Sequence, residues 1–178
     1  MERKSLFTHF IECFTQNYLN FSGRARRREY WGTILFVSLL WAILLFIGVF
    51  TLVAHLGGML YEAGLEQAFL SFGGGMLFLF VLVLIYLICL FPLWAVQVRR
   101  LHDRGMSGWW VLCSVVLSFF QGMVQVMAPD SVAYWVLYVA SVGLGLYIFV
   151  QTLMDGEVGA NKYGEDPKAS ERLGAHQG

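Results

Sequence analysis

The sequence predicts an all-α protein with a four-helix transmembrane bundle, and three observations support this fold class. Of the 178 residues, 58% are hydrophobic and only 13% are charged, whereas about a quarter of an average soluble domain is charged. Four apolar stretches reach the length of about 20 residues that a helix needs to cross the hydrocarbon layer. None of them contains Lys, Arg, Asp or Glu, and they cover residues 31–54, 75–96, 109–127 and 131–153.

These stretches divide the chain into three parts. Residues 1–30 form a basic N-terminal segment, residues 31–154 the membrane domain, and residues 155–178 a polar C-terminal tail. Within the first part, apolar residues recur at helical spacing, at Phe7, Phe10, Ile11, Phe14 and Tyr18. This amphipathic helix is too short and too polar to cross, so we expect it to lie along the inner membrane surface or to pack on the protein's own cytoplasmic loops.

The orientation follows from the distribution of charge. The two outer connections carry only Glu62, Glu66 and Asp130 as charged residues. All twelve basic residues fall on the opposite side, together with both termini: Arg3, Lys4, Arg24, Arg26, Arg27, Arg28, Arg99, Arg100, Arg104, Lys162, Lys168 and Arg172. Because short loops rich in Lys and Arg stay in the cytoplasm, we expect a multi-pass protein of the bacterial inner membrane with both termini cytoplasmic.

The first two spans carry few polar residues that would indicate how the helices pack. Tyr30 and Trp31 open the first span, where amphipathic rings favour the headgroup level. The second span has almost no polar stripe, and we expect Pro92 to bend its last turns. The connection between the two spans, residues 55–74, is apolar for a loop and predicts a short interfacial helix between its glycine pairs.

The third and fourth spans carry most of the polar residues at membrane depth. Because residues three and four apart share one face of a helix, the polar residues of the third span form one stripe, which must face protein or water. It is either a hydrogen-bonded seam between helices or the lining of a solvated path. The candidate seam comprises Ser114, Ser118, Gln121 and Gln125, with Gln151 from the fourth span.

Three polar motifs border the spans on the basic side. They read FSGRARRREYWG at residues 21–32, VRRLHDRGMSGWW at 98–110 and GEVGANKYGEDP at 156–167. Arg99 and Arg100 end the second span, where cations suit the helix dipole. Gly105 permits a tight reversal, and Ser107 is placed to cap the third span.

The motifs also predict a binding site for carboxylates or phosphates. Seven arginines in residues 24–28 and 99–104 exceed the nearby Glu29 and Asp103, and guanidinium groups bind both anions in a two-pronged geometry. We expect these arginines to form a clasp with the tail carboxylates, and anionic lipid headgroups to bind the arginines that stay unpaired. The alternative is that the arginines only set the membrane topology. The candidate residues are Arg24, Arg26, Arg27, Arg28, Arg99, Arg100, His102, Asp103, Arg104, Asn161, Tyr163 and Asp166.

Other classes of site have weaker support. His102 and Asp103 could form an acid–base pair, but neighbouring residues rarely face one site, and no nucleophile accompanies them. Cys13, Cys89 and Cys113 lack the spacing of a zinc or redox site. Lys and Arg together equal Asp and Glu in number, which gives no reason to expect nucleic acid. We expect no catalysis and no cofactor.

The three motifs, in this order, resemble a bacterial inner-membrane family catalogued as domain of unknown function 805, over about residues 6–168. The resemblance implies four membrane spans bracketed by the motifs and no established activity. The matching positions are Phe21, Gly23, Arg24, Arg26, Arg27, Tyr30 and Trp31; Arg99, Arg100, Leu101, His102, Asp103, Gly105, Ser107, Gly108, Trp109 and Trp110; and Gly159, Asn161, Tyr163, Gly164, Asp166 and Pro167.

The sequence thus leads to two functional hypotheses. The first is a small non-catalytic accessory or scaffold protein that binds anionic phospholipid headgroups, a second copy of itself or another membrane protein through the cytoplasmic motifs. The second is an oligomeric pore or transporter lined by the polar stripe of the third span.

Overall fold

The computed structural model describes residues 5–60, 65–169, 171 and 172, and the fold is all-α as predicted. Within these described residues five helices follow one another, and the last four contain the four candidate membrane spans. Their bounds are Leu6–Thr15 for α1, Arg27–Leu60 for α2, Leu65–Asp103 for α3, Trp109–Met127 for α4 and Val132–Leu153 for α5.

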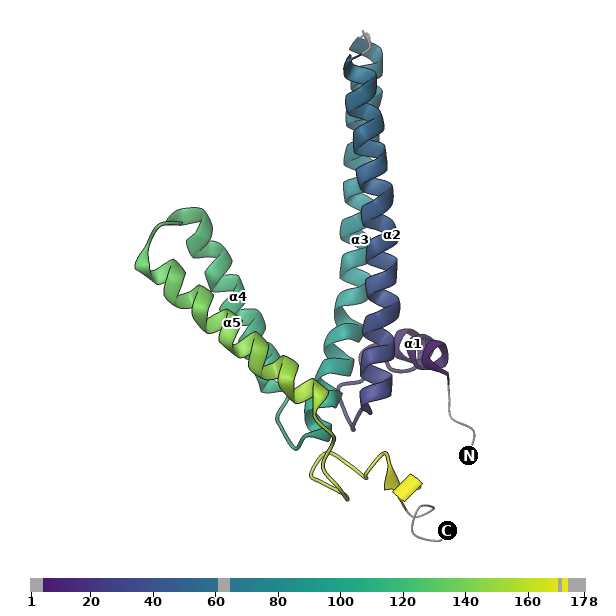
Figure 1. The fold of residues 1–178 in the computed structure, drawn as a ribbon, viewed down its shortest axis with the longest axis vertical. Coiled ribbons are helices and arrows are strands. Elements are labelled where there is room, and N and C mark those ends of the chain that lie inside the picture. Colours follow the sequence, from purple (N-terminus) through teal and green to yellow (C-terminus); the bar gives the residue numbers. More distant parts are fainter. Residues whose placement is uncertain (1–4, 61–64, 170, 173–178) are drawn as a thin grey trace.

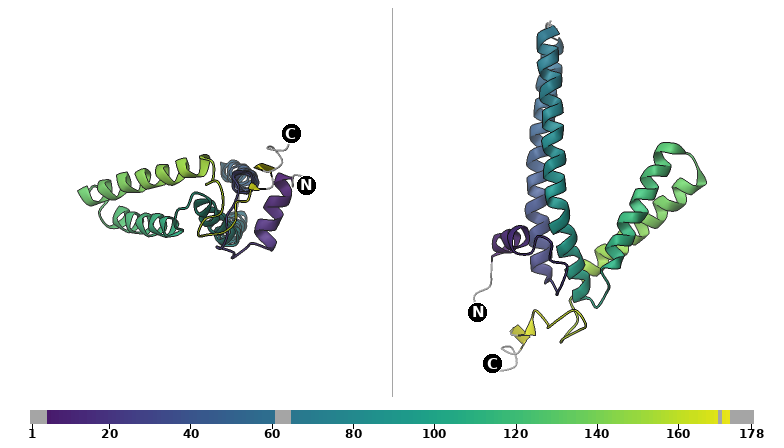
Figure 2. Two further views of the ribbon diagram at one scale, coloured as in Figure 1. Left: turned by 90° about the horizontal axis from the view of Figure 1, so that it is seen from below. Right: turned by 180° about the vertical axis from the view of Figure 1, so that it is seen from behind.

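The four spanning helices pair into two hairpins, α2 with α3 and α4 with α5, which diverge from a common base (Figure 1). The view from behind shows the same V shape (Figure 2). The four helices thus form two hairpins that meet at the base. The base also carries α1, the α3–α4 connection at residues 104–108 and the tail at 154–172; we call this end the basal face.

The buried core lies near the basal face, in two clusters. One joins α1, α2 and α3 through Cys13, Ala25, Tyr30 and Val96. The other joins the two hairpins through Val98 and Leu101 of α3, Val111 of α4 and Ile148 of α5. Away from the base the helices expose large apolar side chains, which suits a surface that faces lipid tails.

Helix α1 begins at Ser5, whose hydroxyl oxygen accepts a hydrogen bond from the Thr8 backbone N–H at 3.0 Å. It packs across the base of α2 and α3: the Phe7 and Phe10 rings contact Phe36 of α2 at centroid distances of 5.5 and 5.4 Å. This contact explains why Cys13, expected on a surface helix, is buried.

The connection predicted at residues 55–74 is largely helical, but not as a separate element. α2 continues to Leu60 and α3 begins at Leu65; residues 61–64 lie outside the described part. The glycine pairs fail to interrupt the helices, although each glycine costs a helix about 1 kcal/mol, because the apolar run around them continues. The expectation of a short interfacial helix was therefore wrong.

Candidate functional site

The basal face brings the three motifs together around the guanidinium of Arg24. Its Nε donates to Oδ1 of Asp103 at 2.9 Å, Nη1 to the carbonyl of Gly159 at 2.6 Å and Nη2 to the carbonyl of Glu157 at 2.6 Å. The side chain is only 1% exposed. One residue therefore ties the segment before α2 to the end of α3 and to the tail; we call the assembly of these contacts the basal knot.

Asp103 is the carboxylate at the centre of the basal knot. Oδ1 accepts from Arg24 and Oδ2 from Nη1 of Arg100, while its backbone carbonyl accepts from the Glu157 N–H at 2.8 Å. A carboxylate this buried would be strongly destabilising without partners. Two guanidiniums, one on each oxygen, compensate it with charge-assisted hydrogen bonds.

Arg100 links the end of α3 to the end of α5. Its side chain is fully buried, and Nε donates to the carbonyl of Thr152 at 3.2 Å, Nη1 to that of Ala25 at 3.4 Å and Nη2 to that of Met154. The last carbonyls of a helix lack partners within it. Arg100 therefore caps α5, and the dipole of that helix favours the cation.

Two further arginines cap the same helix end. Arg27 Nη1 donates to the carbonyl of Leu153 at 3.1 Å, and Arg104 Nη1 to that of Asp155 at 2.5 Å. The predicted clasp is thus present in a different form. The arginines bind main-chain carbonyls of the tail more often than its carboxylates.

The tail carboxylates mostly stabilise the tail itself. Asp155 pairs with Lys168 at 2.7 Å and with Arg27 at 2.9 Å, and the hydrogen bond from Lys168 is the main cause that holds its pKa below the ordinary value. Asp166 is buried, which raises its pKa. Backbone N–H donors from Lys168 and Gly159, with the charges of Arg172 and Arg24, outweigh this effect and lower the pKa overall.

The middle motif also holds the Asn-x-Tyr turn of the tail. The rings of His102 and Tyr163 stack at a centroid distance of 3.8 Å, and Asn161 Nδ2 donates to the His102 carbonyl at 3.0 Å. His102 Nδ1 lies 3.1 Å from the Gly23 carbonyl. His102 and Asp103 therefore contact different partners, and the structure does not place them together as an acid–base pair.

Two glycines allow these close contacts. Gly105 has φ +68°, the left-handed conformation that glycine adopts freely, and a Cβ there would lie 2.2 Å from Glu157 Oε1. A Cβ on Gly156 would lie 2.0 Å from Asp103 Oδ2. The sequence predicted the reversal at Gly105 and counted Glu157 among the tail carboxylates, but it did not predict the role of Gly156, which depends on which segments meet in space.

The other predicted basic residues lie around the basal knot. Arg99 pairs with Glu29, and Arg26 pairs with Glu171 at 2.8 Å. Arg28 is exposed at the first turn of α2. Ser107 accepts from the Trp109 N–H at 3.3 Å, but the N-cap of α4 is Gly108, so Ser107 lies one residue before the capping position predicted for it.

The structure does not bring the candidate seam together. Ser114 donates to the Val111 carbonyl of its own helix at 2.7 Å, and Ser118 and Gln125 are exposed. Gln151 instead accepts from Nε of Arg104 at 3.3 Å, at the edge of the basal knot.

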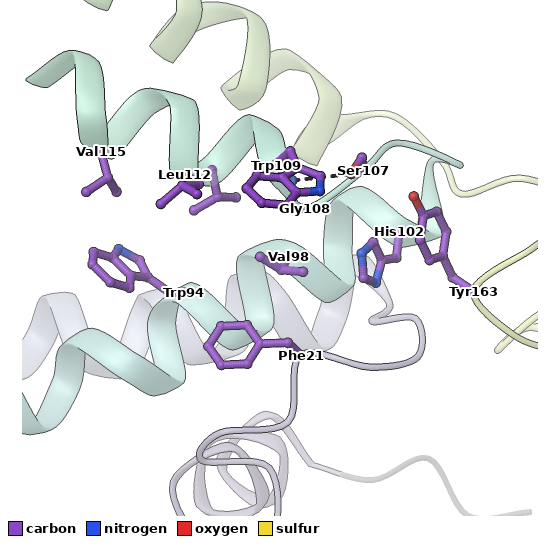
Figure 3. A pocket seen from close by; sticks show the side chains of 11 residues that line it. Phe21, Trp94, Val98, His102, Ser107, Gly108, Trp109, Leu112, Val115 and Tyr163 are labelled. Carbon is purple, nitrogen blue, oxygen red and sulfur yellow. Dashed lines mark hydrogen bonds between the residues drawn. The ribbon is translucent and has the colours of Figure 1, made fainter.

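A pocket of about 610 Å³ opens between α3 and α4 beside the basal knot. Most of its wall is apolar, and its polar residues gather at one end (Figure 3). The lining comprises Phe21, Trp94, Val98, Trp109, Val111, Leu112 and Val115, with Gly108, and His102, Ser107 and Tyr163 at the polar end.

Comparison with known proteins agrees with the resemblance carried by the three motifs. The profile described as protein of unknown function, DUF805, matches residues 18–165. The chain belongs to this family. Within DUF805 it is similar to two Escherichia coli K12 proteins, inner membrane protein YhaH, 35% identical over 86% of this chain and 91% of that protein, and inner membrane protein YhaI, 33% identical over 86% and 90%.

The uncharacterized protein YiiR of the same organism is 28% identical over 83% of this chain and 85% of its own length. No solved structure matches the chain. The DUF805 match ends within the third motif, so it includes all the segments that form the basal knot except the last residues of the tail. The chain is thus an integral membrane protein of DUF805.

Proposed function

We propose that this DUF805 protein is a non-catalytic accessory protein of the bacterial inner membrane, whose basal knot holds two helical hairpins in a fixed V and presents them to a membrane partner. The observation that carries the proposal is the position of Arg24, which bonds the end of α3 and the tail at once. Moving the hairpins apart would break the hydrogen bonds that the buried guanidinium of Arg100, at the end of α3, donates to the carbonyls of Thr152 and Met154 at the end of α5, and hydrogen bonds to charged groups contribute about 1.5–3 kcal/mol each. The names of YhaH and YhaI support the inner-membrane location.

The basal arginines differ in what they can offer to a lipid. Arg24 and Arg100 are buried and donate to protein oxygens, so a headgroup would have to displace these contacts. Arg28 is exposed on the same face and can pair with an anionic headgroup directly. With the basal face in the cytoplasm, as the charge distribution predicts, this contact would be made with the inner leaflet.

The environment of Asp103 supports a non-catalytic role. Both oxygens of this carboxylate already accept from guanidiniums, and the side chain is only 5% exposed. A general acid or base must reach the proton that it transfers. A carboxylate with two fixed positive partners fits a structural role better.

Distances between spin labels on the two hairpins test the proposal. Val53 of α2 and Val126 of α4 are 62% and 86% exposed, and both lie far from the basal face. We would change both to Cys in a Cys113→Ser background, since the other two cysteines are buried. In lipid, the parent should give one narrow distance, and adding Asp103→Asn should broaden it.

The matched control is Glu165→Gln, which changes an exposed tail carboxylate and should keep the narrow distance. A broad distribution in the parent, or a parent-like one in the Asp103→Asn variant, would rule out a fixed V.

The second candidate function, an oligomeric pore or transporter, has one observation in its favour. Ser118 and Gln125 are exposed within the candidate span of α4, where an unpaired polar group is unfavourable. A second copy of the chain would give them partners. Solute flux in vesicles that is lost on changing Gln121 and Gln125 to Leu would favour this function over the scaffold.

A further inference from the structure

The pocket between α3 and α4 has a polar end and an apolar end. His102, Ser107 and Tyr163 line the end near the basal face, while Trp94, Leu112 and Val115 line the other end (Figure 3). Trp94 precedes His102 by about two helical turns along α3. The apolar end therefore reaches into the depth of the spans, and the polar end lies where headgroups would meet the protein.

The size and lining of the pocket suit a hydrocarbon chain. Its volume of about 610 Å³ lies within the range of about 300–1,000 Å³ found for small-molecule sites. An apolar cavity of this kind does not hold water well. Because α3 and α4 both lie within candidate spans, the molecules that reach the pocket sideways are membrane lipids.

The polar end contains a ring nitrogen that faces the pocket. His102 is 9% exposed, and its Nδ1 lies 3.1 Å from the Gly23 carbonyl, which can only accept, so Nδ1 carries the proton. In the neutral ring Nε2 is then an acceptor. It lies 3.5 Å from the position that a Cβ of Gly108 would take in the pocket wall, and it has no hydrogen bond within residues 5–60, 65–169 and 171–172.

Two neighbours add the complementary groups. Ser107 accepts from the Trp109 N–H, which leaves its own hydroxyl proton free to donate. The Lys162 ammonium lies 4.9 Å from the centre of the Tyr163 ring. The end of the pocket thus offers an acceptor for a hydroxyl and a donor for a phosphate oxygen, and the Lys162 charge lies next to the lining residue Tyr163 without belonging to the lining itself.

We propose that this pocket holds one acyl chain of an anionic phospholipid whose headgroup carries a hydroxyl, as in phosphatidylglycerol. The headgroup hydroxyl donates to His102 Nε2, and Ser107 and Lys162 bind the phosphate. An ethanolamine headgroup would place its ammonium beside Lys162, where like charges repel. The inference rests on the proposed function in one respect, since the basal knot must hold α3 and α4 together.

Native mass spectrometry of the full chain tests the site. The protein is released from nanodiscs of phosphatidylcholine that contain either phosphatidylglycerol or phosphatidylethanolamine. The parent should retain one phosphatidylglycerol per chain. Leu112→Trp fills the pocket and should abolish retention, whereas Leu146→Trp, at a 60% exposed position outside the pocket, should retain the lipid like the parent.

The headgroup contact has its own pair of variants. Lys162→Gln, which removes the charge beside the lining residue Tyr163, should weaken phosphatidylglycerol retention about tenfold, while Lys168→Gln, which removes a charge that pairs with Asp155 instead, should leave it unchanged. Equal retention of phosphatidylethanolamine by the parent would overturn the headgroup assignment. Equal retention by the two Trp variants would overturn the acyl-chain site.

The spin-label distance between the hairpins, measured on the same preparations, separates the two proposals. If the parent gives a narrow distance distribution but retains no lipid, the lipid site is overturned and the scaffold function still stands. If the parent gives a broad distance distribution but retains the lipid, the scaffold function is overturned and the lipid site still stands.

Discussion

The Tyr18 hydroxyl donates a hydrogen bond to the carbonyl oxygen of Ile88 at 2.8 Å. Ile88 precedes Pro92 by four residues inside α3. In a regular helix the N–H of residue 92 would bond this carbonyl, but proline has no N–H. The segment after α1 thus binds the carbonyl that the proline leaves free, about four turns before the end of α3.

This relationship predicts that Tyr18 and Pro92 act together. Tyr18→Phe should loosen α1 by about 1 kcal/mol, the usual net value of one hydrogen bond. In a Pro92→Ala background the loss should be smaller, because the restored N–H then bonds Ile88. The rate at which a thiol reagent reaches Cys13, which α1 buries against Ala25, Tyr30 and Val96, measures the loosening. Equal effects in the two backgrounds would contradict the coupling.

Arg100 provides a test of guanidinium geometry. Its side chain donates in several directions, to Asp103 and to main-chain carbonyls, and the ammonium of a lysine cannot reproduce this fork. We expect Arg100→Lys to destabilise tail docking by about 1–3 kcal/mol, the range for hydrogen bonds to charged groups. Faster tryptic cleavage after Lys162 should report the change.

The control for this variant is Arg26→Lys. Arg26 makes a partly exposed pair with Glu171, and such surface pairs contribute only about 0–1 kcal/mol. Its cleavage rate should stay near that of the parent. If Arg100→Lys also left the cleavage rate unchanged, the positive charge alone, and not the guanidinium geometry, would hold the tail.

The spans and the meeting of the motifs were predictable from sequence for physical reasons. Twenty apolar residues without a charge have few alternatives to a membrane helix, and the excess of arginine indicated that anionic or polar partners lay nearby. The partners themselves were not predictable. The carbonyls at the end of α5 that bind Arg100 belong to Thr152 and Met154, and any residue type supplies a carbonyl.

The pocket and the V shape depend on tertiary geometry. Trp94 and Leu112 read as ordinary apolar span residues, and the angle between α3 and α4 makes them neighbours. The role of Gly156 is hidden for the same reason, since the side chain that requires a glycine there belongs to Asp103, in another motif. Such features appear when the segments are placed in space.

Acid should release the tail through Asp166. Its pKa lies below the ordinary value of 3.8, so the ionised form is favoured in the docked state. Docking is then fully stabilised above the ordinary value and loses this contribution as the pH falls through the lowered pKa. A spin label at Val158, which is 79% exposed in the tail, should stay ordered from pH 7 to about 5 and become mobile below about 4.

Asp166→Asn identifies the titrating group. The amide cannot ionise, so the variant should be more mobile at neutral pH and lose most of its response between about pH 5 and 3. An unchanged acid transition in this variant would assign the release to other carboxylates.

The orientation of the basal face is the last prediction. Val132, at the start of α5, and Val158, in the tail, are each 79% exposed and lie at opposite ends of the membrane domain. In the Cys113→Ser background, a cysteine at Val132 should react with a membrane-impermeant thiol reagent on intact spheroplasts. A cysteine at Val158 should react only after the membrane is opened, because the basic residues around the basal knot keep that face in the cytoplasm. The reverse pattern would place the knot, and the headgroup end of the pocket, at the outer leaflet.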